Sequence, residues 1–146
     1  MGELLYSSKT KVKVGFFDVD PMNVVWHGNY VKYMEIARCA LLDEIGYNYT
    51  AMVADGFAFP VVEVRLKYIK PLVFDETATI TSSIVEYENC LKIKYEIYNE
   101  KGELATKAMS NQMVVKIGSG ETQFVCPKRF IDNVKSAIAA KNGGDE

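Results

Sequence analysis

The sequence predicts an α+β domain in which an antiparallel β-sheet wraps around one long central α-helix. Apolar residues recur every three or four positions over 28–45, which is typical of a helix with one buried face. Several later segments alternate apolar and polar residues, which is typical of strands with one buried face. The predicted order is one strand, the long helix and then four strands in hairpin succession. Such a sheet needs a single covering layer, and the helix supplies it.

The first strand is predicted over 11–17, where alternation gives way to the apolar pair Phe16 and Phe17. Pro21 and Asn23 then indicate a turn. The long helix follows over 28–45, and we expect it to end at Gly46. Its apolar stripe is wide, so a large surface must cover it. The stripe consists of Tyr30, Tyr33, Met34, Ala37, Ala40, Leu41, Leu42 and Ile45.

The rest of the chain supplies that cover. A short helix is predicted over 49–55, ending at Gly56, and strands are predicted over 61–69, 76–85, 91–98 and 104–117. Residues 99–102 form a predicted hairpin turn. A last helix is predicted over 127–140, with Pro127 at its first position. We expect the open edges of such a sheet to pair with a second copy of the chain, giving a homodimer or a homotetramer.

The composition is that of an ordinary globular protein. The 146 residues suit a single domain over 1–146, with 49% hydrophobic and 25% charged residues. A formal net charge of −2 gives no electrostatic reason to expect nucleic acid or a membrane as the partner. No secretory signal or membrane-spanning apolar run is visible, so we expect a cytoplasmic protein.

The cysteines predict neither a metal site nor a disulfide framework. Cys39, Cys90 and Cys126 are odd in number and widely spaced, without a CxxC pair. We expect them to be buried free thiols. Nucleophilic cysteine catalysis would require the single histidine as its base, and nothing local supports that pairing. We therefore expect no metal and no cofactor.

Reactive side chains concentrate in one segment, residues 18–30. Asp18, Asp20 and the only histidine of the chain, His27, lie in a predicted turn that leads into the long helix. The N–H groups of a helix's first turn lack partners and favour negative charge. Asp20 is interpreted either as a catalytic carboxylate or as a turn and capping residue, and Asp18 as structural. The side chain of His27 could serve the site or only the helix start.

The residues of this segment resemble the 4-hydroxybenzoyl-CoA thioesterase family of hotdog-fold proteins. The resemblance rests on Asp18-x-Asp20-Pro21-x-x-Val24-Val25-Trp26-His27-x-Asn29-Tyr30, followed by Tyr33-Met34-Glu35-x-Ala37-Arg38. Weaker similarity continues through Tyr68-x-x-Pro71 to Pro127, so the likeness spans nearly the whole chain. Family members often carry glycine where this chain has Asn23, and asparagine tolerates left-handed backbone better than most residues.

The resemblance implies hydrolysis of an acyl-CoA thioester, without a metal, at a site on a dimer interface. It places the catalytic aspartate on Asp20, acting as general base or as nucleophile. It also implies that the backbone N–H of His27 polarises the thioester carbonyl. The substrate-binding residues that we expect around them are Asn23, Val24, Val25, Trp26, Asn29 and Tyr30.

Two alternatives to thioester hydrolysis remain open on the sequence. One is a hydratase or dehydratase acting on acyl thioesters, for which His27 is the sole histidine available. The other is a non-catalytic acyl-CoA binding protein. The basic residues of the predicted strands are either contacts for CoA phosphates or a solvated strand face, and we favour the solvated face. They are Arg65, Lys67, Lys70, Lys92 and Lys94.

Overall fold

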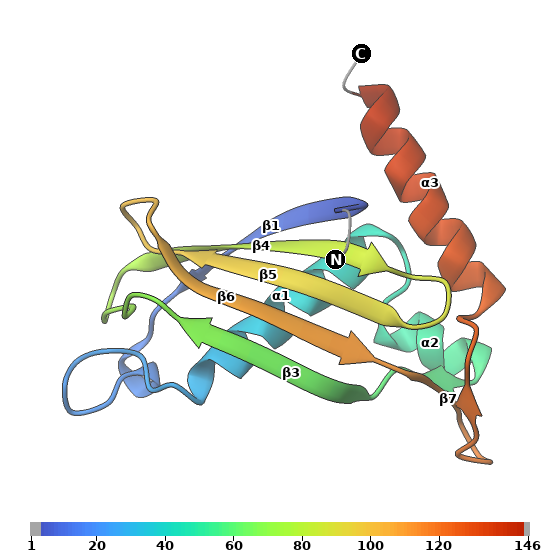
Figure 1. The fold of residues 1–146 in the computed structure, drawn as a ribbon, viewed down its shortest axis with the longest axis horizontal. Helices are drawn as coiled ribbons and strands as arrows, with labels where there is room; N and C mark the ends of the chain where they lie inside the picture. The colour runs from blue at the N-terminus through green and yellow to red at the C-terminus, as the bar shows by residue number, and fades with distance from the viewer. Residues whose placement is uncertain (1–3, 145–146) are drawn as a thin grey trace.

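A computed structural model describes residues 4–144, and it has the predicted sheet wrapped around one long helix (Figure 1). The main sheet is antiparallel throughout, in the order β1-β4-β5-β6-β3. Its strands are β1 (Tyr6–Lys13), β4 (Thr77–Glu86), β5 (Leu91–Tyr98), β6 (Leu104–Gln112) and β3 (Val61–Tyr68). Helix α1 (Asn29–Glu44) packs against one face of this sheet.

The predicted apolar stripe of α1 forms the core with the inner face of the sheet. Tyr33, Ala37 and Leu41 are fully buried. Alternate residues of the sheet meet them, including Ile80 of β4 and Ile93 of β5. Burial of apolar surface of this extent is the main free energy that holds a helix on a sheet.

Shorter elements close the other end of the core. They are α2 (Tyr49–Asp55), α3 (Lys128–Gly144) and a small second sheet of β2 (Phe57–Ala58), β7 (Val114–Lys116) and β8 (Thr122–Gln123). Phe130 of α3 packs on Tyr47 and Phe59 with ring centroids 5.4 and 5.2 Å apart. Figure 1 shows α3 projecting past the sheet from this end, opposite the loop that precedes α1.

Three strand predictions were wrong in position or pairing. The first strand lies at Tyr6–Lys13, and Phe16 and Phe17 belong to an exposed 3-10 turn, η1 (Phe16–Asp18). The predicted strand 104–117 is broken at Met113 into β6 and β7 of two different sheets. β3 pairs with β6 at the sheet edge and not with β4, so the four strands do not follow one another as hairpins.

The two faces of the sheet differ in chemistry. Residues paired across neighbouring strands share one face, and the inner face carries buried residues such as Tyr95 and Ser82. The outer face carries lysine, threonine and serine. Among residues 4–144, no helix is long and apolar enough to span a membrane.

Candidate functional site

The loop between β1 and α1 lies at one end of the sheet, where α1 begins (Figure 1). Its two arms pair through a bridge between Val19 and Val25, and Val24 bridges to Val73. The N–H of Val25 donates to the carbonyl of Leu72 at 2.8 Å. The loop is therefore a small hairpin fixed onto the segment between β3 and β4.

Asp20 begins the tight turn of this hairpin. Its backbone N–H donates to the carbonyl of Val24, and its own carbonyl accepts from the N–H of Asn23, both at 2.9 Å. Its carboxylate Oδ1 accepts from the N–H of Met22 at 2.8 Å. Asn23 has a φ of 66°, so it adopts the left-handed backbone that the turn requires. Within residues 4–144, Oδ2 of Asp20 makes no hydrogen bond and stays available.

Asp18 anchors the loop from inside, as its structural interpretation requires. Its side chain is nearly buried and accepts hydrogen bonds from the Tyr33 hydroxyl at 2.9 Å, the Gly15 N–H at 3.0 Å and the Lys32 ammonium. Burial alone would raise the pKa of Asp18. The hydrogen bonds from Lys32, Gly15 and Tyr33 outweigh it and hold that pKa below its usual range.

The backbone carbonyl of Asp18 fixes the start of α1. It accepts from the N–H of Trp26 at 3.0 Å and from the Asn29 side chain at 2.8 Å. The N–H of Asn29 in turn donates to the Trp26 carbonyl at 2.9 Å. Asn29 therefore acts as a positioning residue in this structure.

His27 lies at the exposed entry to α1. Its carbonyl accepts from the Tyr68 hydroxyl of β3 at 3.0 Å. Its own N–H makes no hydrogen bond with the described part of the chain, 4–144, as expected before a helix. The indole of Trp26 lies 4.8 Å from the imidazole ring and covers Gly28, where a Cβ would meet the indole at 2.1 Å. The glycine therefore makes room for the tryptophan.

The remaining predicted substrate-binding residues differ in exposure. Asn23 and Trp26 are exposed and Val24 is half-buried, whereas Val25 and Tyr30 are buried in the core. The Tyr30 hydroxyl accepts from the N–H of Leu72 at 3.3 Å, and its ring packs edge-on against Tyr68. Contact of any of these residues with a ligand stays a prediction.

Comparison with known proteins identifies the fold and the reaction class. Residues 14–138 match the model of the thioesterase-like superfamily. YneP of Bacillus subtilis, whose name assigns it provisionally as an acyl-CoA thioesterase, is 37% identical over 112 residues, covering 76% of this chain and 81% of YneP. The chain belongs to the thioesterase-like superfamily.

Similarity to other thioesterases supports the same family and reaction class. The acyl-CoA thioester hydrolase YbgC of Escherichia coli O6:H1 is 29% identical over 98 residues, 66% of this chain and 73% of YbgC. The DHNA-CoA thioesterase structure from Staphylococcus aureus superposes with a TM-score of 0.81 at 27% identity, covering 96% and 95% of the two chains. The chain is thus a hotdog-fold thioesterase and a hydrolase.

Two of the three cysteines of this thioesterase are poor nucleophiles, because burial raises the pKa of their thiols. Cys126 is buried, and that burial raises its pKa to about 12, so its thiol stays protonated. Burial also raises the pKa of the half-buried Cys90. Cys39 is exposed on α1, against the expectation of buried thiols, because it lies on the helix side facing away from the sheet. Glu35 and Arg38 form the expected ion pair along α1.

A hollow of about 750 Å³ lies along the second half of α1, away from Asp20. Its walls come from α1, α2 and the segment entering β3, and they include Cys39, Leu42, Met52, Phe59 and Pro60. This volume lies in the range of small-ligand pockets. The hollow was not predicted, because its walls come from segments with no shared sequence pattern.

Sequence reasoning also missed three side chains that hold the loop, namely Lys32, Tyr33 and Tyr68. Lys32 and Tyr33 lie within the first five residues of α1, so their closeness to Asp18 could have been inferred from helix geometry. Tyr68 lies 41 residues from His27, and no local pattern relates the two.

Proposed function

We propose that this thioesterase hydrolyses acyl-CoA, with Asp20 as general base or nucleophile and the backbone N–H of His27 as the donor to the thioester oxygen. The observation that carries the proposal is that one hydrogen-bonded loop holds both a carboxylate oxygen and a backbone N–H without a partner among residues 4–144. They are Oδ2 of Asp20 and the N–H of His27. The names of YneP and YbgC support acyl-CoA as the substrate class.

The chemistry needs one group that delivers oxygen and one that holds the oxyanion. A carboxylate can deprotonate water, or attack the acyl carbon directly and form an anhydride that water then cleaves. A backbone N–H at a helix start holds the oxyanion without rearrangement, because the helix fixes its direction. That helix start is fixed in this chain by the hydrogen bond that the Asp18 carbonyl accepts from Asn29 and by the one that Tyr68 donates to the His27 carbonyl.

The test is free-thiol release from a panel of acyl-CoAs of different acyl groups. Asp20→Asn is expected to lower kcat by about 10²- to 10⁴-fold, the usual contribution of a positioned acid or base. His27→Ala is the matched control, since it removes the imidazole and keeps the N–H. It is expected to keep most of the activity. An Asp20→Asn variant as fast as the wild type would remove Asp20 from the mechanism.

The same two variants separate the alternatives that the sequence left open. A hydratase or dehydratase built on the imidazole would lose its activity in His27→Ala. A non-catalytic binder would show saturable acyl-CoA binding and no thiol release in any variant. The exposed imidazole makes no hydrogen bond to a carboxylate among residues 4–144, which favours hydrolysis over hydration.

We also propose that a second subunit completes the site. β3 is an edge strand, and apolar side chains such as Val62 lie exposed on it. Antiparallel pairing of β3 with its copy about a twofold axis would bring the Val61 end of one strand beside the Tyr68 end of the other. The hollow lies at the first end and His27 at the second. The acyl group would then enter the hollow of the partner subunit.

A cytoplasmic location stays a prediction.

A further inference from the structure

Positive charge is concentrated on the outer face of the main sheet, although the chain has a formal net charge of −2. Strand pairing places eight of the 17 lysines and arginines on this face. They are Lys9, Lys11, Lys13, Arg65, Lys67, Lys92, Lys94 and Lys107. The strand carboxylates on the same face are Glu63, Glu86 and Glu96. The overall charge therefore conceals a basic surface.

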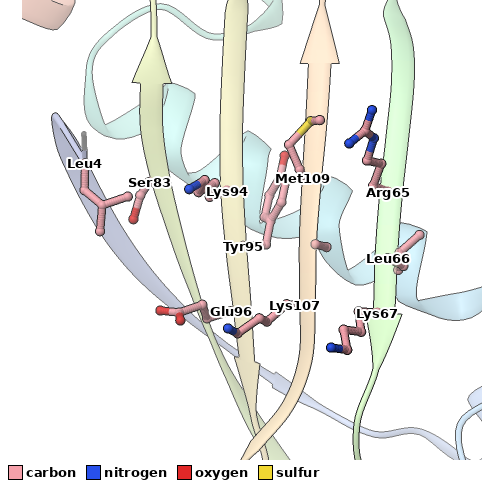
Figure 2. Close-up of a pocket in the computed structure, with 11 residues that line it drawn as sticks. Leu4, Arg65, Leu66, Lys67, Ser83, Lys94, Tyr95, Glu96, Lys107 and Met109 are labelled. Atoms are coloured by element: carbon pink, nitrogen blue, oxygen red, sulfur yellow. The ribbon is translucent and has the colours of Figure 1, made fainter. Parts of the chain in front are cut away.

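The basic surface has more than one hollow, and Figure 2 shows the one lined by the most cationic side chains. The hollow measures about 670 Å³, the size of a small-ligand pocket. Four cationic side chains from three strands line it, namely Arg65, Lys67, Lys94 and Lys107, with Glu96 as the anionic one. This hollow is separate from the one along α1.

The register explains how the hollow is built. Met109 of β6 lies opposite Lys94 of β5 on one side and opposite Arg65 of β3 on the other. Lys107 precedes it by two residues and so faces the same way. An apolar floor is thus surrounded by cations on three sides. Figure 2 shows these side chains spread around Met109.

Three of the four cations are unpaired. Lys67, Lys94 and Lys107 form no ion pair within residues 4–144, and the exposed Arg65 pairs only with the half-buried Glu63 at 3.0 Å. Lys67 of β3 and Lys107 of β6 lie directly opposite each other, and like charges in that position repel one another. An anion with several negative groups would relieve that repulsion and gain charge-assisted hydrogen bonds.

We infer that this hollow binds a nucleoside carrying several phosphate groups, with the base on Met109 and the phosphates on Arg65, Lys67, Lys94 and Lys107. Such a group has two sources. One is the nucleotide half of coenzyme A, and only this source rests on the proposed function. The other is a free nucleotide that binds as a separate ligand. Lys67 directly precedes Tyr68, which bonds His27, so the hollow and the site share one strand.

The direct test is calorimetric titration with adenosine 3′,5′-bisphosphate, and with adenosine as the uncharged comparison. The wild type is expected to bind the bisphosphate saturably and adenosine at least tenfold more weakly. A Lys94→Glu, Lys107→Glu double variant is expected to lose at least tenfold in affinity, since each charge-assisted contact is worth about a factor of ten. Circular dichroism verifies that it folds.

The control is Lys9→Glu, Lys11→Glu, which makes the same change of charge on the same face outside the hollow. Its affinity for the bisphosphate is expected to fall less than threefold. An equal loss of bisphosphate affinity in both double variants would mean that the anion is attracted by the charge of the whole sheet face. That result would overturn the proposed site. Absence of saturable binding to the wild type would overturn it as well.

Kinetics then distinguish the two sources. If coenzyme A occupies the hollow, the Lys94, Lys107 variant raises KM for an acyl-CoA and leaves KM for the matching acyl-pantetheine unchanged. If a free nucleotide occupies it, bisphosphate binding is lost and both KM values are unchanged. Each result supports the site. If the protein binds the bisphosphate but hydrolyses no thioester, the proposed function is contradicted. The proposed binding site in the hollow is still supported by that result.

Discussion

Asp18 is the single residue on which most of the loop depends. Three donors meet its nearly buried carboxylate, and two further groups meet its carbonyl. Asp18→Asn keeps the shape but removes the charge that pairs with Lys32. We expect a loss of about 2 kcal/mol in the free energy of unfolding, measured by urea denaturation at pH 7.

The pH dependence of stability gives a second readout of Asp18. Its folded pKa is lowered, so its contribution is fully present above the unfolded value of about 3.9 and is lost as pH falls through the folded pKa. In the wild type this contribution therefore falls away only at acid pH. Asp18→Asn is expected to be less stable than the wild type at neutral pH and to approach it as pH falls through the folded pKa of Asp18. A constant difference at all pH values would contradict the assignment.

Gly28 is required by the size of its neighbour and not by its backbone. Its φ of −67° and ψ of −23° suit any residue, but a Cβ would meet the Trp26 ring at 2.1 Å. Gly28→Ala is therefore expected to displace the indole. Trp26 is the only tryptophan, so its fluorescence emission reports the shift directly.

The double variant Trp26→Ala, Gly28→Ala is the control for this prediction. Without the indole, alanine fits at position 28 and helix propensity favours it over glycine. In a double-mutant cycle, the loss of unfolding free energy caused by Gly28→Ala should therefore disappear when residue 26 is already alanine. A Gly28→Ala cost that is the same with and without the indole would rule out steric displacement.

The turn from Asp20 to Val24 is the element that decides where the carboxylate of Asp20 lies. Asn23 holds the left-handed conformation at a φ of 66°. Asn23→Gly is expected to preserve kcat, because glycine adopts this backbone freely. Asn23→Ala is expected to lower the free energy of unfolding by about 1 kcal/mol and to lower kcat. Thermal unfolding and thiol release measure both effects. Equal kcat in the two variants would show that the turn does not position Asp20.

Elements with a strong repeating pattern could be predicted from the sequence to within a residue or a few. The helix expected over 28–45 is observed at Asn29–Glu44, and the strand expected over 91–98 is observed there. Elements with little pattern were missed, such as the two-residue β2. The bounds predicted for β1 were wrong because Phe16 and Phe17, two apolar residues in an exposed turn, resemble a strand end.

The sequence predicts where the candidate residues Asp20 and His27 lie in the chain's elements, but not the contacts that hold them there. Asp20 and His27 are adjacent to a turn and a helix that the sequence shows. The contacts that hold them come from Tyr33 and Tyr68, and the second of these depends on the place of β3 beside β6. Strand order of this kind follows from packing of the whole sheet, which no short segment encodes.

At the scale of the whole molecule, the composite site that we propose predicts complementation between two inactive variants. Asp20→Asn removes the carboxylate, and Cys39→Trp fills the hollow along α1. In a heterodimer, one site combines the intact Asp20 of one chain with the intact hollow of the other. Mixing the two after denaturation and refolding is expected to restore about a quarter of wild-type activity.

The control mixes Asp20→Asn with the Asp20→Asn, Cys39→Trp double variant, which leaves every site without its carboxylate. This mixture should remain inactive. If the first mixture also remains at the sum of its two components, the hollow and Asp20 do not cooperate between subunits, and the composite site is wrong.

The hydrogen bond from Tyr68 to His27 connects the edge of the sheet to the start of α1. Pairing at that edge and ligand binding at that helix start are therefore expected to be thermodynamically linked. Linkage is reciprocal, so a bound acyl-CoA should strengthen subunit association by the same factor by which association strengthens acyl-CoA binding. The specific activity of this enzyme should then fall on dilution and recover on addition of substrate.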